Sequence, residues 1–175
     1  MAGMKGRFIP KNPGKYLGNP NTIMFRSAWE LRVMQFFDAN ISVYKWGSEE
    51  IKIPYIKPTD GRVHHYYPDF LVVYKDKEGN ILKEIVEVKP LKESVARPNM
   101  SNYDKMAYIV NQAKWEAAAA FAAAHGMKFR VITEESIFID AKRKAESKLA
   151  RQNKPTRRTR KTTGTVAPSA GKQKK

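Results

Sequence analysis

Apolar residues recur along most of the chain at the spacings of helices and strands. In the first helix-like stretch they include Trp29, Val33 and Phe37, and Asn21 or Thr22 precedes them as a candidate N-cap. Shorter apolar runs rich in Val, Ile and Tyr predict strands. The expected helices span residues 22–39, 102–125 and 134–149, and the expected strands span residues 42–46, 50–56, 69–74, 85–89 and 128–132.

The order of these elements predicts an α/β domain with a central mixed β-sheet flanked by helices. The strands at 69–74 and 85–89 are separated by a stretch that contains Glu78-Gly79-Asn80, a turn signal, so they are expected to pair as a hairpin. The strand at 128–132 follows a long helix, and we expect it to join the sheet in parallel through a right-handed crossover.

Length and composition indicate one globular domain with two unusual ends. A chain of 175 residues, 42% of them hydrophobic, can bury a substantial core, and the absence of cysteine excludes disulfides and thiolate metal sites. Residues 1–20 form a basic arm rich in glycine and proline, and residues 21–150 are expected to form the folded domain. Residues 151–175 are expected to be a disordered basic tail, because they have no periodic apolar pattern.

The positive charge is concentrated toward the C-terminus. Of the net charge of +16, residues 141–175 carry 13 lysines or arginines against one acid, whereas residues 1–140 carry 20 against 16 acids. This block favours a polyanionic partner such as DNA, although a solvated tail that only aids solubility would have the same composition. No apolar stretch is long enough to span a bilayer, so no membrane partner is expected. The expected DNA-binding residues are Arg143, Lys144, Lys154, Arg157, Arg158, Arg160 and Lys161.

Candidate chemistry is concentrated in the predicted hairpin. Asp69 opens one strand, and Glu87 and Lys89 lie in the other, where alternation places both side chains on one face. Two carboxylates can hold a hard divalent cation, and an adjacent ammonium can contact a water or a phosphate oxygen, a combination suited to phosphodiester cleavage. Alternatively, Asp69 satisfies a turn, and Glu87 and Lys89 form an ordinary surface ion pair.

Three further residues are candidates for the same site. Glu30 is the best candidate for a third acid, although a helix-surface pair with Arg26 would explain it as well. Lys114 lies on an apolar helical stripe, where it either extends toward solvent or reaches a nearby anion. His65 lies four residues before Asp69 and is given an accessory role. It is not expected to chelate an ion together with the preceding histidine, because adjacent side chains on a strand point to opposite faces.

The chain resembles the PD-(D/E)xK nucleases. Pro68-Asp69 followed by Glu87-Val88-Lys89 matches their signature, and Phe25-Arg26-Ser27-Ala28-Trp29-Glu30 resembles the segment that carries the first acid in a subgroup of them. The wider pattern is similar to the head completion nucleases of T4-like tailed phages and, more distantly, to the end-cleaving endonuclease subunit of some heteromeric transposases. The likeness spans roughly residues 22–138, with further matching segments at residues 48–55, 65–70, 86–90, 111–115 and 129–134.

The resemblance implies a restriction-endonuclease-like core and Mg²⁺-dependent cleavage of double-stranded DNA, with Mn²⁺ as a substitute cofactor. It implies Glu30, Asp69 and Glu87 as metal-binding acids and Lys89 as the catalytic lysine. The backbone carbonyl of Val88 is a further candidate ligand. Whether one or two metal ions take part stays open.

The head completion nucleases also imply a biological setting. DNA that protrudes from packaged phage heads would be trimmed before neck and tail attach, in the host cytoplasm or at the virion neck, with portal or neck proteins as partners. Two alternatives stay open: a structural neck or DNA-binding protein that keeps an inactive nuclease fold, and a transposon end-cleaving endonuclease subunit that needs a partner transposase.

Overall fold

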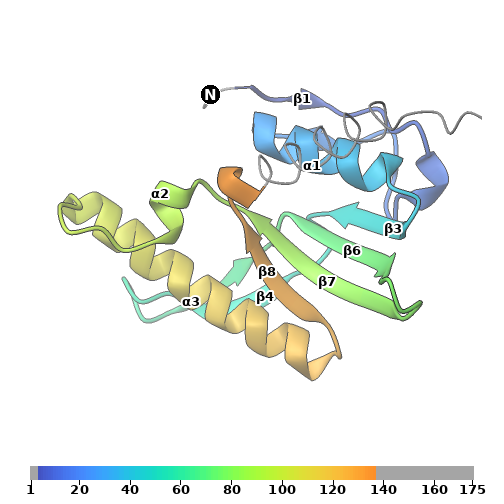
Figure 1. Ribbon diagram of the computed structural model, residues 1–175. Helices are drawn as coiled ribbons and strands as arrows, with labels where there is room; N and C mark the ends of the chain where they lie inside the picture. The colour runs from blue at the N-terminus through green and yellow to red at the C-terminus, as the bar shows by residue number, and fades with distance from the viewer. Residues whose placement is uncertain (1–3, 137–175) are drawn as a thin grey trace, which may run out of the picture. The chain divides into compact units, whose positions relative to one another are not determined.

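The structure is a computed structural model that describes residues 4–136 (Figure 1). Most of the helix expected over residues 134–149, the basic tail and all the expected DNA-binding residues lie outside the described part. The helices are α1 (Ala28–Ala39), α2 (Leu91–Ser94) and α3 (Asn102–Ala124), with a 3-10 turn η1 (Pro13–Lys15). The strands are β1 (Gly6–Arg7), β2 (Met24–Phe25), β3 (Val43–Ser48), β4 (Ile53–Ile56), β5 (Val63–Tyr66), β6 (Phe70–Lys75), β7 (Ile81–Val88) and β8 (Lys128–Ile132).

A four-stranded mixed sheet forms the centre of the domain, as expected. Its strand order is β3-β6-β7-β8. β6 pairs antiparallel with both β3 and β7, and β8 joins β7 in parallel after α3. The expected hairpin is therefore confirmed, and it lies in the middle of the sheet.

Helices cover both faces of this sheet (Figure 1). Phe70, Val72 and Val86 pack with the residues of α1, whereas Leu71 and Ile85 pack with those of α3. This division follows from the alternation of side chains along a strand. Glu87 shares the parity of Ile85, so its side chain lies on the α3 face.

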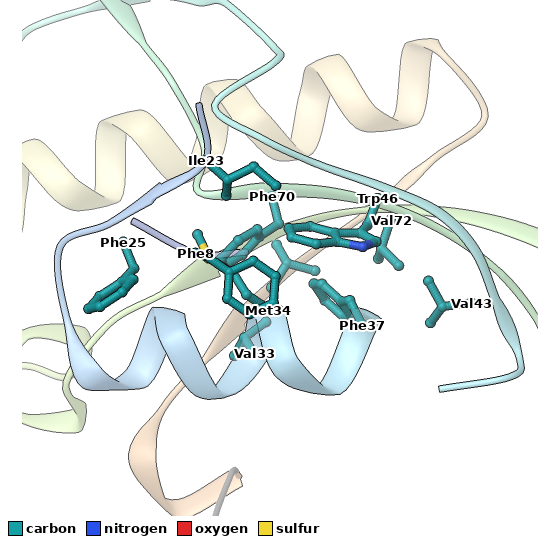
Figure 2. Close-up of a cluster of buried hydrophobic side chains, with 11 residues drawn as sticks. Phe8, Ile23, Phe25, Val33, Met34, Phe37, Val43, Trp46, Phe70 and Val72 are labelled. Carbon is teal, nitrogen blue, oxygen red and sulfur yellow. The ribbon is translucent and has the colours of Figure 1, made fainter. Parts of the chain in front are cut away.

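The core on the α1 face is strongly aromatic (Figure 2). Trp46 of β3 is fully buried, and its ring meets those of Phe37 and Phe70 at centroid distances of 6.3 and 6.4 Å. Phe8, from the basic arm, packs edge-on against the same ring at 5.8 Å. Burial of large aromatic side chains contributes much of the hydrophobic stabilisation of a small domain.

On the α3 face, a separate two-stranded sheet supports the helix. β4 and β5 pair with each other and not with the central sheet, and β4 begins at Ile53, later than the expected start at residue 50. Tyr55 of β4 and Tyr66 of β5 are buried in the same cluster as Trp115 of α3. This small sheet places two tyrosines between α3 and the end of β7.

The expected start of the first helix at residue 22 is wrong. Residues Met24–Phe25 pair with Gly6–Arg7 as a short antiparallel ladder, and the helix begins only at Ala28. Ser27 is the N-cap: its hydroxyl accepts the backbone N–H of Glu30 at 3.1 Å. A strand pairing with a distant segment thus overrides the local helical spacing.

The arm packs against the domain through Asp38 and Tyr16. The buried carboxylate of Asp38 accepts the backbone N–H groups of Lys11 and Asn12 at 2.8 and 3.0 Å. Tyr16 forms an isolated bridge with Trp46, which extends the sheet beside its β3 edge. Residues 4–17 therefore contribute to the core and to the sheet edge.

α3 agrees with its predicted span. Ser101 caps its N-terminus, and Gly126 adopts a left-handed φ of 64° directly after the C-cap His125. The stretch expected to be a loop before α3 contains the short helix α2. No helix in the described residues has both the length and the apolar character needed to cross a membrane.

Candidate active site

The candidate site lies at the open end of the β6–β7 hairpin. Asp69 directly precedes β6, and Glu87 and Lys89 lie at the end of β7. One carboxylate oxygen of Asp69 accepts the backbone N–H of Val88 at 2.7 Å. This bond ties the start of one strand to the end of the other and brings the first two acids of the predicted signature together.

The two acids share a poorly hydrated environment. Burial, followed by the negative charge of Glu87, raises the pKa of Asp69 from its ordinary 3.8 to about 8. The N–H of Val88 and the ammonium of Lys89 oppose this shift, whereas the charge of Glu30 adds to it. Carboxylates that repel each other in this way would be stabilised by a shared cation.

Glu87 is held by partners on both oxygens. The hydroxyl of Tyr66 donates a hydrogen bond to Oε2 at 2.6 Å, and Nζ of Lys89 lies 3.6 Å from Oε1. The side chain of Glu87 is buried, and burial together with the Glu87 charge raises the pKa of Tyr66, which keeps the Tyr66 hydroxyl protonated as a donor. The predicted proximity of Glu87 and Lys89 is confirmed, and it occurs at the partly buried end of β7.

Glu30 lies nearby, but its carboxylate is engaged in the helix cap. Oε1 accepts the hydroxyl of Ser27 at 2.9 Å, and Oε2 accepts the backbone N–H of Arg26 at 2.8 Å. The arrangement resembles a capping box, except that the backbone N–H that Glu30 accepts belongs to Arg26, the residue before the N-cap. The negative charge of Glu30 adds to the rise in the pKa of Asp69, so the two carboxylates share one electrostatic environment.

The donor set fits a hard divalent cation with few protein ligands. Among residues 4–136, no three His, Asp or Glu side chains converge into a complete metal site. Asp69 and Glu87 nevertheless provide two neighbouring carboxylates, and burial followed by the negative charge of Glu87 raises the pKa of Asp69. Mg²⁺ commonly binds through one or two carboxylates and keeps several waters, so this pair is a chemically sufficient protein contribution.

The two accessory candidates lie in different settings. Lys114 is half-buried, and its ammonium lies 5.9 Å from the ring centre of Tyr55 and 5.8 Å from that of Tyr66. His65 is exposed on β5 opposite Pro54, and no contact between it and the acids is found in the described residues. The structure brings Lys114 toward the acids and leaves His65 at the surface.

Two features of the site were not anticipated from the sequence. One is Tyr66, whose place on the buried side of the strand 63–66 could have been inferred from alternation. The other is an ion pair in which both terminal nitrogens of Arg26 donate to the carboxylate of Glu49. Glu49 has a φ of 57°, and its N–H donates to the backbone carbonyl of Asp69 at 3.1 Å. No local pattern predicted this pairing.

Comparison with known proteins identifies the family. Residues 40–134 match the family model described as TnsA-like endonuclease N terminal. The chain belongs to this TnsA-like endonuclease family. The match contains Asp69, Glu87, Lys89 and Lys114, and it agrees with the resemblance to PD-(D/E)xK nucleases drawn from the signature residues.

A curated relative extends the likeness over most of the chain. The chain is 34% identical over 142 residues to the head completion nuclease of Enterobacteria phage T4, an alignment that covers 75% of this chain and 92% of the relative. Membership of the TnsA-like endonuclease family thus rests on both the family model and a nearly full-length nuclease relative.

Proposed function

We propose that the protein is a metal-dependent DNA endonuclease that acts in head completion of a tailed phage. The observation that carries this proposal is the meeting of Asp69, Glu87 and Lys89 at the end of the hairpin, in a chain of the TnsA-like endonuclease family. The relative of phage T4 is named a head completion nuclease, which supports the biological setting.

Asp69 and Glu87 would hold Mg²⁺, with the carbonyl oxygen of Val88 as a further ligand. Mn²⁺ has the same preference for oxygen ligands and would substitute. When bound, the metal supplies Lewis acidity that polarises the scissile phosphate and lowers the pKa of a water. Since both Glu30 oxygens accept hydrogen bonds at the start of α1, from Arg26 and Ser27, Glu30 would act on the site through water.

Lys89 would orient the attacking water or stabilise charge that develops on the phosphate oxygens. Its side chain is 28% exposed and its ammonium lies beside Glu87, so a short movement would bring the ammonium to a substrate phosphate. Preorganised cations of this kind lower the barrier most where water is excluded. Tyr66 would keep Glu87 oriented throughout, because its hydroxyl is a fixed donor to Oε2.

In the phage setting, the enzyme would trim DNA that protrudes from packaged heads before the neck and tail attach. It would work in the host cytoplasm, where double-stranded DNA is the substrate and portal or neck proteins are docking partners. The basic residues beyond the described part would hold the duplex through sequence-tolerant phosphate contacts.

A cleavage assay tests this function against the alternatives. Linear and circular duplex DNA would be incubated with the full chain and Mg²⁺, with EDTA as the metal-free control. We expect cleavage only with metal, and we expect Asp69→Asn and Lys89→Ala to abolish it while DNA binding persists. Lys83→Ala is the matched control, because Lys83 is exposed at the far end of the same strand.

The results of this assay distinguish the proposed endonuclease from the structural protein and from the transposon subunit. Metal-dependent cleavage in the purified protein alone supports the proposal and excludes an inactive nuclease fold. Binding without turnover under every metal condition would favour the structural protein. Cleavage that requires a second protein and defined DNA ends would favour the transposon subunit.

A further inference from the structure

Lys114 is a half-buried cation in the middle of α3, on the face that packs against the β4–β5 sheet. Val110, Ala117 and Phe121 share its helical stripe and pack into the core cluster of the α3 face. The Lys114 ammonium therefore emerges from an apolar surface. Its ring contacts hold it between β4 and β5, at 5.9 Å from Tyr55 and 5.8 Å from Tyr66.

In the part of the chain that the structure describes, the ammonium of Lys114 has no ion-pair partner. Burial lowers the pKa of Lys114, and the positive charge of Lys89 lowers it further, while Glu87 opposes the shift. A lysine side chain that extended toward solvent would keep its ammonium hydrated. The half-buried position of the Lys114 ammonium therefore points to an anionic ligand that offsets its desolvation.

A chain of contacts connects Lys114 to the acids. The ring of Tyr66 lies beneath the Lys114 ammonium, and its hydroxyl donates to Glu87, whose other oxygen lies 3.6 Å from Lys89. Both ammonium groups therefore lie in the electrostatic field of Glu87. Lys57 follows β4 two residues after Tyr55, so alternation places it on the side of that strand that faces α3.

We propose that Lys114 binds a backbone phosphate of the DNA strand that is cut, adjacent to the scissile phosphate, with Tyr55 and Tyr66 fixing its position. This inference rests on the proposed function, because it presumes a nucleic-acid substrate at the carboxylates. Lys57, Lys114 and Lys89 then mark the path by which the strand crosses the β4–β5 sheet and reaches the site. A phosphodiester suits this place because its single negative charge compensates the ammonium without requiring a second protein donor.

The test measures the salt dependence of DNA binding by the full chain in EDTA, where cleavage does not interfere. A covalently closed circular duplex is the probe, because it contains backbone phosphates and no terminal ones. The variants are Lys114→Gln and Lys114→Arg, with Lys105→Gln as the control. Lys105 is an exposed lysine of the same helix about two and a half turns away, hence on the opposite face.

We expect Lys114→Gln to weaken binding and to reduce the slope of log affinity against log salt by about 0.9, the value for one lost phosphate contact. Lys114→Arg should keep the wild-type slope, and Lys105→Gln should leave affinity and slope unchanged. Lys114→Gln should also raise the KM for cleavage. If Lys114→Gln does not fold, Lys114→Met, which keeps the length of the side chain, replaces it.

The failure of this inference can be told apart from that of the proposed function. A wild-type protein that cleaves with Mg²⁺, together with an unchanged slope for Lys114→Gln, would overturn the phosphate site alone. A reduced slope in a protein that never cleaves would support the phosphate site and remove the enzymatic function. An equal reduction of the salt-dependence slope in Lys114→Gln and Lys105→Gln would also contradict the phosphate site, because it would indicate a general effect of the lost positive charge.

Discussion

The hydroxyl of Tyr66 donates a 2.6 Å hydrogen bond to the buried carboxylate of Glu87. This contact joins the small β4–β5 sheet to the end of β7, two elements that belong to different sheets. It occupies Oε2 of Glu87, while the ammonium of Lys89 lies beside Oε1. The orientation of the Glu87 side chain is therefore controlled by a residue outside the signature.

Loss of the Tyr66 hydroxyl should weaken Mg²⁺ binding. We expect Tyr66→Phe to raise the Mg²⁺ concentration for half-maximal cleavage by about 10- to 100-fold, because residues that orient metal ligands commonly contribute that much. Cleavage titrated against Mg²⁺ measures the effect. Tyr67→Phe is the control, since Tyr67 is 48% exposed and precedes the site in sequence. Identical titrations for both variants would contradict a role for the hydroxyl.

The stability of the metal-free protein should depend on the proton at Asp69. Its pKa in the folded state, about 8, lies above the ordinary 3.8, so the folded protein binds the proton more tightly than the unfolded chain. This stabilisation is complete below the lower value and is lost as the pH rises through the upper one. The free energy of unfolding in EDTA should therefore fall by an amount on the order of a few kcal/mol across this window.

Denaturant unfolding of wild type and Asp69→Asn at about pH 5 and about pH 9 measures this effect. The difference in stability between the two proteins should change with pH, because the variant lacks the titrating group while all other groups are shared. Added Mg²⁺ should restore the stability of the wild type at the higher pH. A pH-independent difference between the proteins would exclude the raised pKa.

The backbone at Glu49 should prefer glycine to alanine. Glu49 is the non-glycine residue with positive φ in the described part of the chain, and a left-handed conformation strains a residue that has a Cβ. Glu49→Gly and Glu49→Ala both remove the ion pair with Arg26, so comparing them isolates the backbone. We expect Glu49→Gly to be the more stable by about 1 kcal/mol in denaturant unfolding. Equal stabilities would show that this backbone is unstrained.

Substitution of Asp38 should detach the basic arm from the domain. The two carboxylate oxygens of Asp38 accept the backbone N–H groups of Lys11 and Asn12, whereas an asparagine side chain has only one acceptor oxygen. Asp38→Asn should therefore destabilise the protein by about 2 kcal/mol and speed proteolysis within residues 4–17. Glu78→Gln, in the exposed turn between β6 and β7, is the control. Unchanged proteolysis would show that Asp38 does not hold the arm.

Removal of residues 150–175 should separate binding from catalysis. These residues are strongly basic, so their loss should weaken DNA binding and flatten its salt dependence. Cleavage at saturating DNA should persist, because Asp69, Glu87 and Lys89 are retained. Salt titrations of the full and truncated chains test this prediction, and equal slopes would exclude the tail from DNA contact.

Local sequence patterns determined much of the fold and the placement of the signature residues. The alternation of β7 placed Glu87 and Lys89 on one face, and the turn residues between β6 and β7 were sufficient to predict the hairpin that carries Asp69. The long helix and β8 followed from apolar spacing and end signals. These features were predictable because their hydrogen bonds and burial patterns arise from residues close in sequence or from a repeating period.

Tertiary contacts decided where α1 begins and how the site is completed. Met24 and Phe25 have helical spacing, but pairing with the arm places them in a strand and leaves Ser27 to cap the helix. The same cap engages both oxygens of Glu30, and the packing of β4 and β5 under α3 brings Tyr66 and Lys114 toward Glu87. Periodicity predicts which side of an element is buried, but the partner that a side chain meets there comes from segments distant in the chain.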